Sequence, residues 1–398
     1  MQVQANSTAK AHGLDGTLVE PDWPPLTLDE VCGLLRHYPA LGAPAKLVTV
    51  SPRPFSAASV VATEREQVFI KRHHVAVRNR EGLGEEHRFM AHLRSRGAAV
   101  PRVIAAGSGE TAMRLREWVY EVHEIPPGLD LYEDAISWTP FRSGAHAHSA
   151  GQALARLHLA SHGYDAPVRR LRQLVAGFTI FAAGNPRAEF DRYVTSRPAL
   201  SKYLQTRDSR DEALSLLARF HEELLPLLPS LAPLWTHNDW HASNLMWSDD
   251  GANARAVSVI DFGLADRTNA VHDLAHAIER NVVGWLALVE NPARPEDVPV
   301  RYDHLYALLD GYYSVRPLSR EECLALAPMT ALCHAEFALS ETDYFLSVLR
   351  SEEKARMACE GYLVSHARWF RGPGSTLLEV LRTWARKQTN ASRGPAAR

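Results

Sequence analysis

The spacing of hydrophobic residues changes character near residue 125. Before it, short apolar runs alternate with polar turns, which is the pattern of β-strands. Thr27 can cap a helix, Glu30 completes a capping box, and a second helix is expected at about Gly84–Arg96. The expected strands are Lys46–Val50, Ser59–Thr63, Gln67–Arg72, Pro101–Ala106 and Arg114–Val122. This part is predicted to be a small β-rich module.

Beyond that point the apolar residues recur at helical spacing, and only two short strands interrupt, near Asn244–Trp247 and Ala256–Ile260. The expected helices are Ser149–Ser161, Ala188–Leu204, Asp211–Leu228, Val271–Val289, Tyr302–Tyr313, Arg320–Ser340 and Leu377–Lys387. The pattern predicts an α+β fold of two lobes. A small β-rich N-lobe with one key helix precedes a large, mainly helical C-lobe, with a cleft between them.

Pro126-Pro127-Gly128 punctuates the chain where the pattern changes, so the lobe boundary is placed there. The N-lobe is expected over residues 23–125 and the C-lobe over 126–386, with a helical insert at 160–230. The ends, 1–22 and 387–398, are polar and aperiodic, so both are expected to be disordered tails.

Composition narrows the class of protein. The chain has 398 residues, of which 46% are hydrophobic and 23% charged, as in ordinary globular proteins. A formal net charge of −2 argues against nucleic acid as a partner. The four cysteines form no C-x-x-C pair, which indicates a reducing compartment without structural zinc. The N-terminus lacks an apolar signal core, and the longest apolar stretches noted are too short to span a bilayer, so a cytoplasmic protein is expected.

One stretch carries the strongest chemical signal. Residues 235–247 contain His237-x-Asp239-x4-Asn244, and a later strand ends in Asp261-Phe-Gly. Transfer of a phosphoryl group needs a carboxylate beside the acceptor hydroxyl, and an amide and a second carboxylate to hold Mg²⁺. Asp239 fits the first role as the catalytic residue, and Asn244 and Asp261 fit the second as metal ligands.

With these motifs, and with Asp273-Leu-Ala twelve residues after Asp261, the chain resembles the aminoglycoside phosphotransferase and choline kinase family. The resemblance covers about residues 45–290. It implies the protein-kinase-like fold and transfer of the γ-phosphate of ATP or GTP to a hydroxyl, with Mg²⁺ as cofactor and without a covalent phospho-enzyme.

The resemblance also implies a lysine on an N-lobe strand and a glutamate on the following helix. Lys71 supplies the first and Glu86 the second. Glu86 is central on the apolar face, because apolar residues follow it three, four and seven positions later. Glu85, the rival, points about a hundred degrees away. The pair would present Lys71 to the phosphates of the nucleotide.

The segment expected to cover the phosphates, residues 51–59, departs from the family because it contains no glycine. Ser56 and Ser59 offer hydroxyl and backbone N–H groups instead, and an ordinary polar turn is the equal alternative. The residues matching the adenine-binding connection between the lobes, through backbone groups, are Val122, His123, Glu124 and Ile125.

Three further residues are assigned supporting roles. His237 is expected to brace the catalytic loop by hydrogen bonding, and Asp273 to anchor the loop backbone from the start of a helix. His241 lies two residues after Asp239, where it either donates to the γ-phosphate or merely packs. His158 is expected to be a core histidine on an apolar helix stripe.

The short stretch between Asp261 and Asp273 leaves no room for the activation segment of a protein kinase. A small-molecule acceptor is therefore favoured. Residues 233–350 hold 17 Asp and Glu against 8 Arg and no Lys, which suggests an amine-bearing acceptor such as an aminoglycoside, amino alcohol or hydroxy-amino acid. The candidates to line its pocket are Glu279, Glu336, Glu341 and Asp343. The alternatives are a protein Ser/Thr kinase and an inactive nucleotide-binding module.

Overall fold

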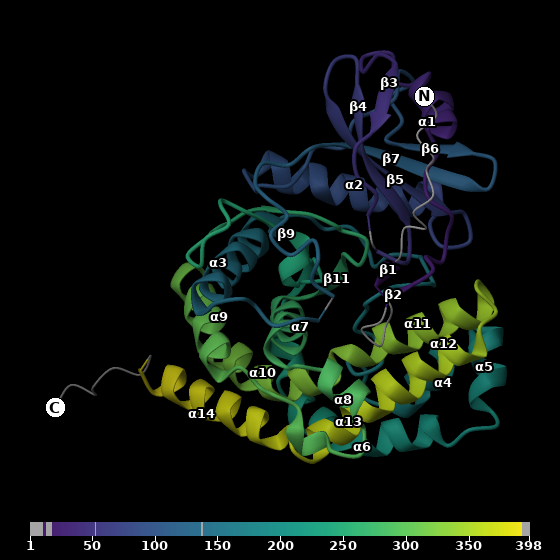
Figure 1. The fold of residues 1–398 in the computed structure, drawn as a ribbon. Coiled ribbons are helices and arrows are strands. Elements are labelled where there is room, and N and C mark those ends of the chain that lie inside the picture. Colours follow the sequence, from purple (N-terminus) through teal and green to yellow (C-terminus); the bar gives the residue numbers. More distant parts are fainter. Residues whose placement is uncertain (1–10, 13–17, 52, 137, 392–398) are drawn as a thin grey trace. The chain divides into compact units, whose positions relative to one another are not determined.

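The fold was analysed in a computed structural model that describes residues 11–12, 18–51, 53–136 and 138–391. The chain divides into two compact units (Figure 1). The first holds the described residues up to 94 together with 100–127, and the second holds 95–99 and the described residues from 128 onward. The division after Pro127 falls two residues beyond the expected boundary.

The first unit is built on a five-stranded antiparallel sheet in the order β3-β4-β5-β7-β6. Its strands are β3 (Pro44–Leu47), β4 (Ala57–Thr63), β5 (Gln67–His74), β6 (Ala112–Leu115) and β7 (Trp118–Glu124). Its helices are α1 (Leu28–Leu35) and α2 (Arg80–Ser95), and β1 (Ala11–His12) pairs with β2 (Leu18–Val19). The capping box of Thr27 and Glu30 is present at the start of α1.

The two helices cover opposite faces of this sheet. Ile70 and Val122 are cross-strand partners, and both are buried in a core that contains the apolar face of α1. Lys71 and Glu121 form the next pair, so their side chains leave the sheet on the other face. Glu121 bonds to His87 of α2, which places α2 on the face that carries Lys71.

Three predictions in this unit were wrong. Arg114–Val122 is not one strand but a hairpin, because the chain turns at Arg116, which has a φ of 58°. Pro101–Ala106 makes only an isolated bridge at Val103. The N-terminal tail contains the paired strands β1 and β2.

The second unit is mainly helical, as expected, and the predicted α+β class is confirmed. Its α-helices are α3 (Gly144–Ser161), α4 (Pro186–Thr195), α5 (Pro198–Leu204), α6 (Ser209–Leu224), α7 (Ala270–Val282), α8 (Leu286–Glu290), α9 (Tyr302–Val315), α10 (Arg320–Leu332), α11 (His334–Ser347), α12 (Glu352–Arg356), α13 (Ser365–Arg371) and α14 (Ser375–Ala391). Shorter turns are η1 (Leu228–Ser230), η2 (Ala242–Asn244), η3 (Pro295–Asp297) and the π-helical η4 (Met357–Val364).

Three of the helices expected here are broken. The predicted helix Arg320–Ser340 is interrupted at Cys333, between α10 and α11. Pro198 ends α4 and starts α5 within the predicted helix Ala188–Leu204, since proline cannot donate the next helical hydrogen bond. The predicted helix Val271–Val289 stops at Val282 and resumes as α8. At the other end of the chain, α14 extends to Ala391, past the expected start of the tail, and residues 392–398 lie outside the described part.

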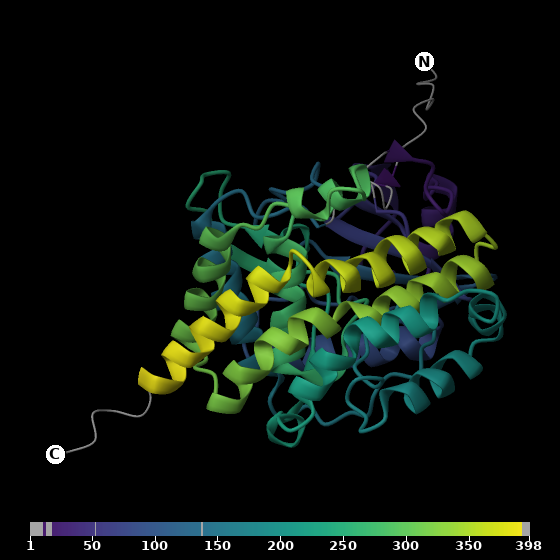
Figure 2. The same cartoon turned by 90° about the horizontal axis from the view of Figure 1, so that it is seen from below.

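Helix α7 is the centre of this unit, because all thirteen of its residues are buried. Helices α3 and α9 cross at backbone contact, where Gly151 and Gly311 leave room for each other's chain. Helix α14 packs along α10 (Figure 2). The segment Arg320–Ser347, which forms α10 and α11, is long and apolar enough to span a membrane, but its most apolar window is 94% buried, as in a core helix.

Candidate functional site

Two small hairpin-like pairings frame the catalytic loop, residues 237–244. Strand β8 (Pro233–Thr236) leads into the loop and pairs with β11 (Asp266–Asn269), and β9 (Leu245–Trp247) leaves it and pairs with β10 (Ala256–Val259). The Ile260 N–H donates to the Asn244 carbonyl at 2.9 Å, and the His237 ring bonds to the Ile260 carbonyl at 3.0 Å. These bonds hold Asp261, the next residue, beside the catalytic loop.

Asp273 anchors this loop, as the sequence predicts. Its two carboxylate oxygens accept the backbone N–H groups of His237 and Asn238, each at 2.8 Å. The buried His158 ring lies 2.9 Å from the same carboxylate. Burial alone would raise the pKa of Asp273, but the hydrogen bond and charge of His158 and the His237 amide outweigh it and hold the pKa at about 2. The carboxylate is therefore ionised and fully bonded within the protein.

His237 braces the loop through both ring nitrogens. Nδ1 accepts the Asp239 N–H at 3.2 Å, so Nε2 carries the proton that goes to the Ile260 carbonyl. Burial lowers the pKa of His237, which keeps the ring neutral. This geometry matches the supporting role expected from the sequence.

Three side chains converge on the carboxylate of Asp239. Asn244 Nδ2 donates to Oδ2 at 3.0 Å, and His241 Nε2 lies 3.5 Å from Oδ1. Arg280, on α7, forms an ion pair with Oδ1. Asp239 is 18% exposed, whereas Arg280 is 1% exposed. The carboxylate is thus held in one orientation from the protein side while part of it faces solvent.

The sequence analysis missed two residues of this site, Arg280 and Asn281. The Asn281 side chain accepts the Ala242 N–H at 3.0 Å and donates to the Trp240 carbonyl at 2.7 Å. Their spacing in the sequence could have identified them. They lie seven and eight residues after Asp273, which places them on the same side of the helix. A single helix face therefore fixes the loop at both ends.

The oxygen donors at this site suit Mg²⁺. The side-chain nitrogen of Asn244 is bonded to Asp239. The oxygen donors to a metal would therefore be the side-chain carbonyl of Asn244 and the carboxylate of Asp261. Oxygen ligands of this kind are those that Mg²⁺ takes. Asp261 has a φ of 57°, a left-handed conformation that few residue types besides glycine adopt readily. Strained backbone of this kind is frequent at functional sites.

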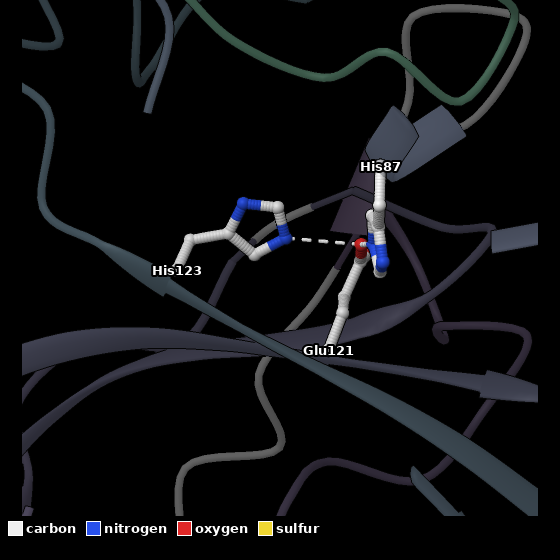
Figure 3. Close-up of side chains that lie close together, drawn as sticks. All are labelled: His87, Glu121 and His123. Atoms are coloured by element: carbon white, nitrogen blue, oxygen red, sulfur yellow. Dashed lines mark hydrogen bonds and ion pairs between the residues drawn. The ribbon is translucent and has the colours of Figure 1, made fainter. Parts of the chain in front are cut away.

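In the first unit, α2 is joined to the sheet by a cluster of four side chains. The carboxylate of Glu121 meets Nε2 of His73 at 2.9 Å, of His87 at 2.8 Å and of His123 at 2.9 Å (Figure 3 shows the last two). Burial would raise the pKa of Glu121, but the three histidines hold it well below its usual range. An ionised carboxylate only accepts, so each Nε2 donates and the cluster is satisfied without an ion.

This cluster positions the two residues predicted to act on the nucleotide. Lys71 lies beside Glu121 across the β5–β7 pairing, and Glu86 precedes His87 on α2 and is buried. Both belong to the same face of the sheet and the helix that covers it. Their pairing with each other remains a prediction.

The residues predicted to contact phosphate and adenine are partly engaged in the sheet. The Ser59 hydroxyl, on β4, donates to the Thr49 carbonyl, so a phosphate contact would break that bond. Ser56 lies directly before β4. In the adenine segment, the Val122 carbonyl and the Glu124 N–H already bond to residues 104 and 102. Ile125, past the end of β7 and 40% exposed, is the better candidate for a backbone contact.

Of the four acidic residues suggested for the acceptor pocket, two are braces. Glu336 accepts the Ile180 N–H at 2.6 Å, and Asp343 accepts from Gln173 at 3.1 Å. Glu279 is buried and bonds to the His366 ring. Burial raises the pKa of Glu279 to about 8, so this side chain is largely protonated at neutral pH. The acidic charge expected for the pocket is therefore smaller than the sequence suggests.

A protein-kinase-like fold with a candidate catalytic aspartate, a candidate metal pair and an aspartate that anchors the loop between them is typical of phosphotransferases. The profile of the phosphotransferase enzyme family, which includes the aminoglycoside phosphotransferases, matches residues 54–318. The chain belongs to this family, and the predicted resemblance is confirmed.

Known proteins agree with this assignment. The chain is 25% identical over 263 residues to the homoserine kinase of Cupriavidus necator, covering 65% of this chain and 68% of that one. A microcompartment-associated aminopropanol kinase shares the fold with a TM-score of 0.55 at 17% identity, over 89% of this chain and 99% of that one. An amicoumacin kinase solved with AMP-PNP and Ca²⁺ has a TM-score of 0.54 at 13% identity, over 84% and 93% of the two chains. The last two likenesses show the fold alone.

Proposed function

We propose that this protein is a kinase that uses ATP or GTP and Mg²⁺ to phosphorylate a hydroxyl of a small, amine-bearing molecule in the cytoplasm. The observation that carries the proposal is the environment of Asp239, whose carboxylate is oriented by Asn244 and Arg280 while part of it stays exposed. A carboxylate held in this way can accept a proton from an incoming hydroxyl. The family membership supports the same reaction.

The reaction is a direct in-line transfer. The acceptor oxygen attacks the γ-phosphorus, a new O–P bond forms, and the bond from that phosphorus to the β,γ-bridging oxygen breaks. The nucleoside diphosphate leaves with the electron pair, and the hydroxyl proton passes to Asp239. Asn244 and Asp261 would hold Mg²⁺, which neutralises charge on the phosphates. Lys71, steadied by Glu86, would bind the phosphates from the first unit.

The acceptor class is inferred from size and charge. Only eleven residues separate Asp261 from Asp273, and β11 and the start of α7 occupy most of them. A peptide-docking activation segment therefore has no counterpart here, which favours a small acceptor over a protein. The homoserine and aminopropanol kinases named above act on small amine-bearing alcohols, in keeping with this acceptor class.

A mass-spectrometric transfer assay tests the proposal. The protein is incubated with Mg²⁺, ATP or GTP and pooled amino sugars, amino alcohols, hydroxy-amino acids and neutral sugars, with Asp239→Asn as the control. We expect a phosphate mass gain on a small acceptor that disappears in the control. Phosphorylated protein without phosphorylated metabolite would support the protein-kinase alternative. Neither transfer nor stabilisation by nucleotide would support the inactive module.

A further inference from the structure

Buried polar groups without partners gather around Arg280. Its Nη1 pairs with Asp239, but its Nε and Nη2 have no hydrogen-bond partner among the described residues, although both are buried. Leaving such buried donors unbonded is unfavourable, and more so when they belong to a charged group. Both ring nitrogens of His276, one helical turn earlier on α7, are in the same condition. A ligand that accepts hydrogen bonds would satisfy these groups.

The geometry of the guanidinium selects the ligand. Nε and Nη2 form one edge of the planar group, and two parallel donors on one edge match the two oxygens of a carboxylate. The other side of the group is already used by Asp239. Arg280 can therefore hold the catalytic carboxylate and a second carboxylate at once. Neutral acceptors such as sugars offer no matching pair of charged oxygens.

The surroundings of Arg280 also contain an acidic group. The Arg280 guanidinium lies 5.2 Å from the ring centroid of Phe337 on α11, and Glu341 follows Phe337 by one turn on that helix. The Tyr362 ring lies 6.2 Å from the Phe337 ring, and the Tyr362 hydroxyl has no hydrogen-bond partner among the described residues. An arginine suited to a carboxylate and a glutamate suited to an ammonium group therefore both lie near Phe337.

We infer that the acceptor is a hydroxy-amino acid, whose carboxylate binds the Nε–Nη2 edge of Arg280, whose ammonium group faces Glu341, and whose side-chain hydroxyl meets Asp239. This inference rests on the proposed function and narrows it. Arg280 is the specificity-determining residue. It distinguishes an amino acid from the corresponding amine by about 10- to 100-fold, as expected for charged hydrogen bonds.

Matched substrate pairs test this subsite. L-homoserine is compared with 3-aminopropan-1-ol, and L-serine with ethanolamine, because the members of each pair differ only by the carboxylate. Steady-state kcat/KM is measured for the wild type and for Arg280→Lys, which keeps the positive charge but loses the two-donor edge. Arg382→Lys is the control, since it removes a partly buried guanidinium that pairs with Glu223 instead.

We expect at least one amino acid to exceed its amine by 10-fold or more in the wild type and in Arg382→Lys. In Arg280→Lys this ratio should fall toward one, mainly through KM. Equal or faster transfer to the amines, or transfer only to aminoglycosides, would overturn the inference while the proposed kinase function stands. An equal loss for all acceptors in Arg280→Lys would also overturn it, by assigning Arg280 to the phosphoryl group or to Asp239. If no acceptor were phosphorylated, the result would contradict the proposed kinase function itself.

Discussion

His158 and Asp273 meet at 2.9 Å in a fully buried pair that joins α3 to α7. The Tyr312 hydroxyl of α9 bonds to the other nitrogen of the same imidazole at 2.7 Å. Because Asp273 also accepts two N–H groups of the catalytic loop, this chain of bonds connects three helices to the loop that carries Asp239. The core of the second unit thus positions the loop together with the hydrogen bonds that His237 and Asn244 make within it.

Replacing Asp273 by Asn tests this connection. The amide keeps the shape but offers one oxygen to three donors, and its NH₂ group faces a donor. We expect the free energy of unfolding to fall by about 3 kcal/mol and kcat to fall together with it. Urea denaturation and steady-state kinetics measure the two effects. Asp303→Asn, an exposed pair with Arg301, is the control and should change neither by much. A D273N variant of wild-type stability would contradict the anchoring role.

The crossing of α3 and α9 predicts a strong effect of a single methyl group. A Cβ on Gly311 would lie 2.0 Å from the His148 carbonyl oxygen, so Gly311→Ala forces the two backbones apart. We expect a loss of stability of about 1–3 kcal/mol or more, as for overpacked cores. Gly33→Ala is the control, because a Cβ there meets nothing within 4 Å and lies in a helix. That variant should be neutral or slightly stabilised in a thermal melt.

Glu279 predicts a dependence of stability on pH. Burial raises its pKa to about 8 in the folded protein, above the usual value of 4.5. The folded state therefore binds a proton that the unfolded state has released, and this contribution is complete below about pH 4.5 and is lost as the pH rises to about 8. Glu279→Gln, which imitates the protonated form, should lose less stability over this range. Parallel slopes of unfolding free energy against pH in the two proteins would argue against a protonated Glu279.

Asp239→Asn should reduce kcat on the order of 10²–10⁴-fold if the carboxylate takes the proton of the acceptor hydroxyl. The fold should persist at reduced stability, because the new amide keeps one oxygen for a partner but turns its NH₂ group toward a donor of Asn244 or Arg280. Circular dichroism checks the fold, and turnover of the acceptor found in the transfer assay checks the role. Near-full turnover in this variant would show that another group receives the proton.

The histidine cluster predicts a coupling between Glu121 and the nucleotide residues. Glu121→Gln replaces an acceptor of three hydrogen bonds with a group that both donates and accepts, so α2 loses part of its attachment to β7. We expect a loss of about 1–3 kcal/mol in stability and a smaller thermal shift with AMP-PNP. Glu110→Gln, a solvent-exposed carboxylate paired with Arg80, is the control. An unchanged nucleotide shift in E121Q would separate the cluster from nucleotide binding.

The sequence predicted those parts of the site that depend on local spacing. One short strand pair joins the segments of Asn244 and Asp261, as expected, and Asp273 occupies the start of a helix. The catalytic and metal-binding roles of Asp239, Asn244 and Asp261 stay predictions. Arg280 was missed because its contact with Asp239 depends on how α7 is rotated against a loop far away in the sequence. The hairpin at Arg116 was missed because arginine rarely adopts a positive φ, so no turn residue marked it. Pro198 indicated a break in the predicted helix Ala188–Leu204. One continuous helix was predicted nevertheless, because the apolar residues on either side of the proline have helical spacing.

The left-handed backbone at Asp261 limits how this chain can change over time. Glycine adopts a φ of 57° without strain, and asparagine and aspartate tolerate it better than branched and bulky residues do. Two requirements therefore restrict the residue at position 261. The backbone conformation is one, and the charged oxygen ligand proposed for Mg²⁺ is the other. Aspartate alone meets both. A descendant that abandoned catalysis but kept its fold would carry Asn or Gly there in preference to Ala or Glu. The substitution found at this one position would then reveal whether a lineage had lost the chemistry or the structure.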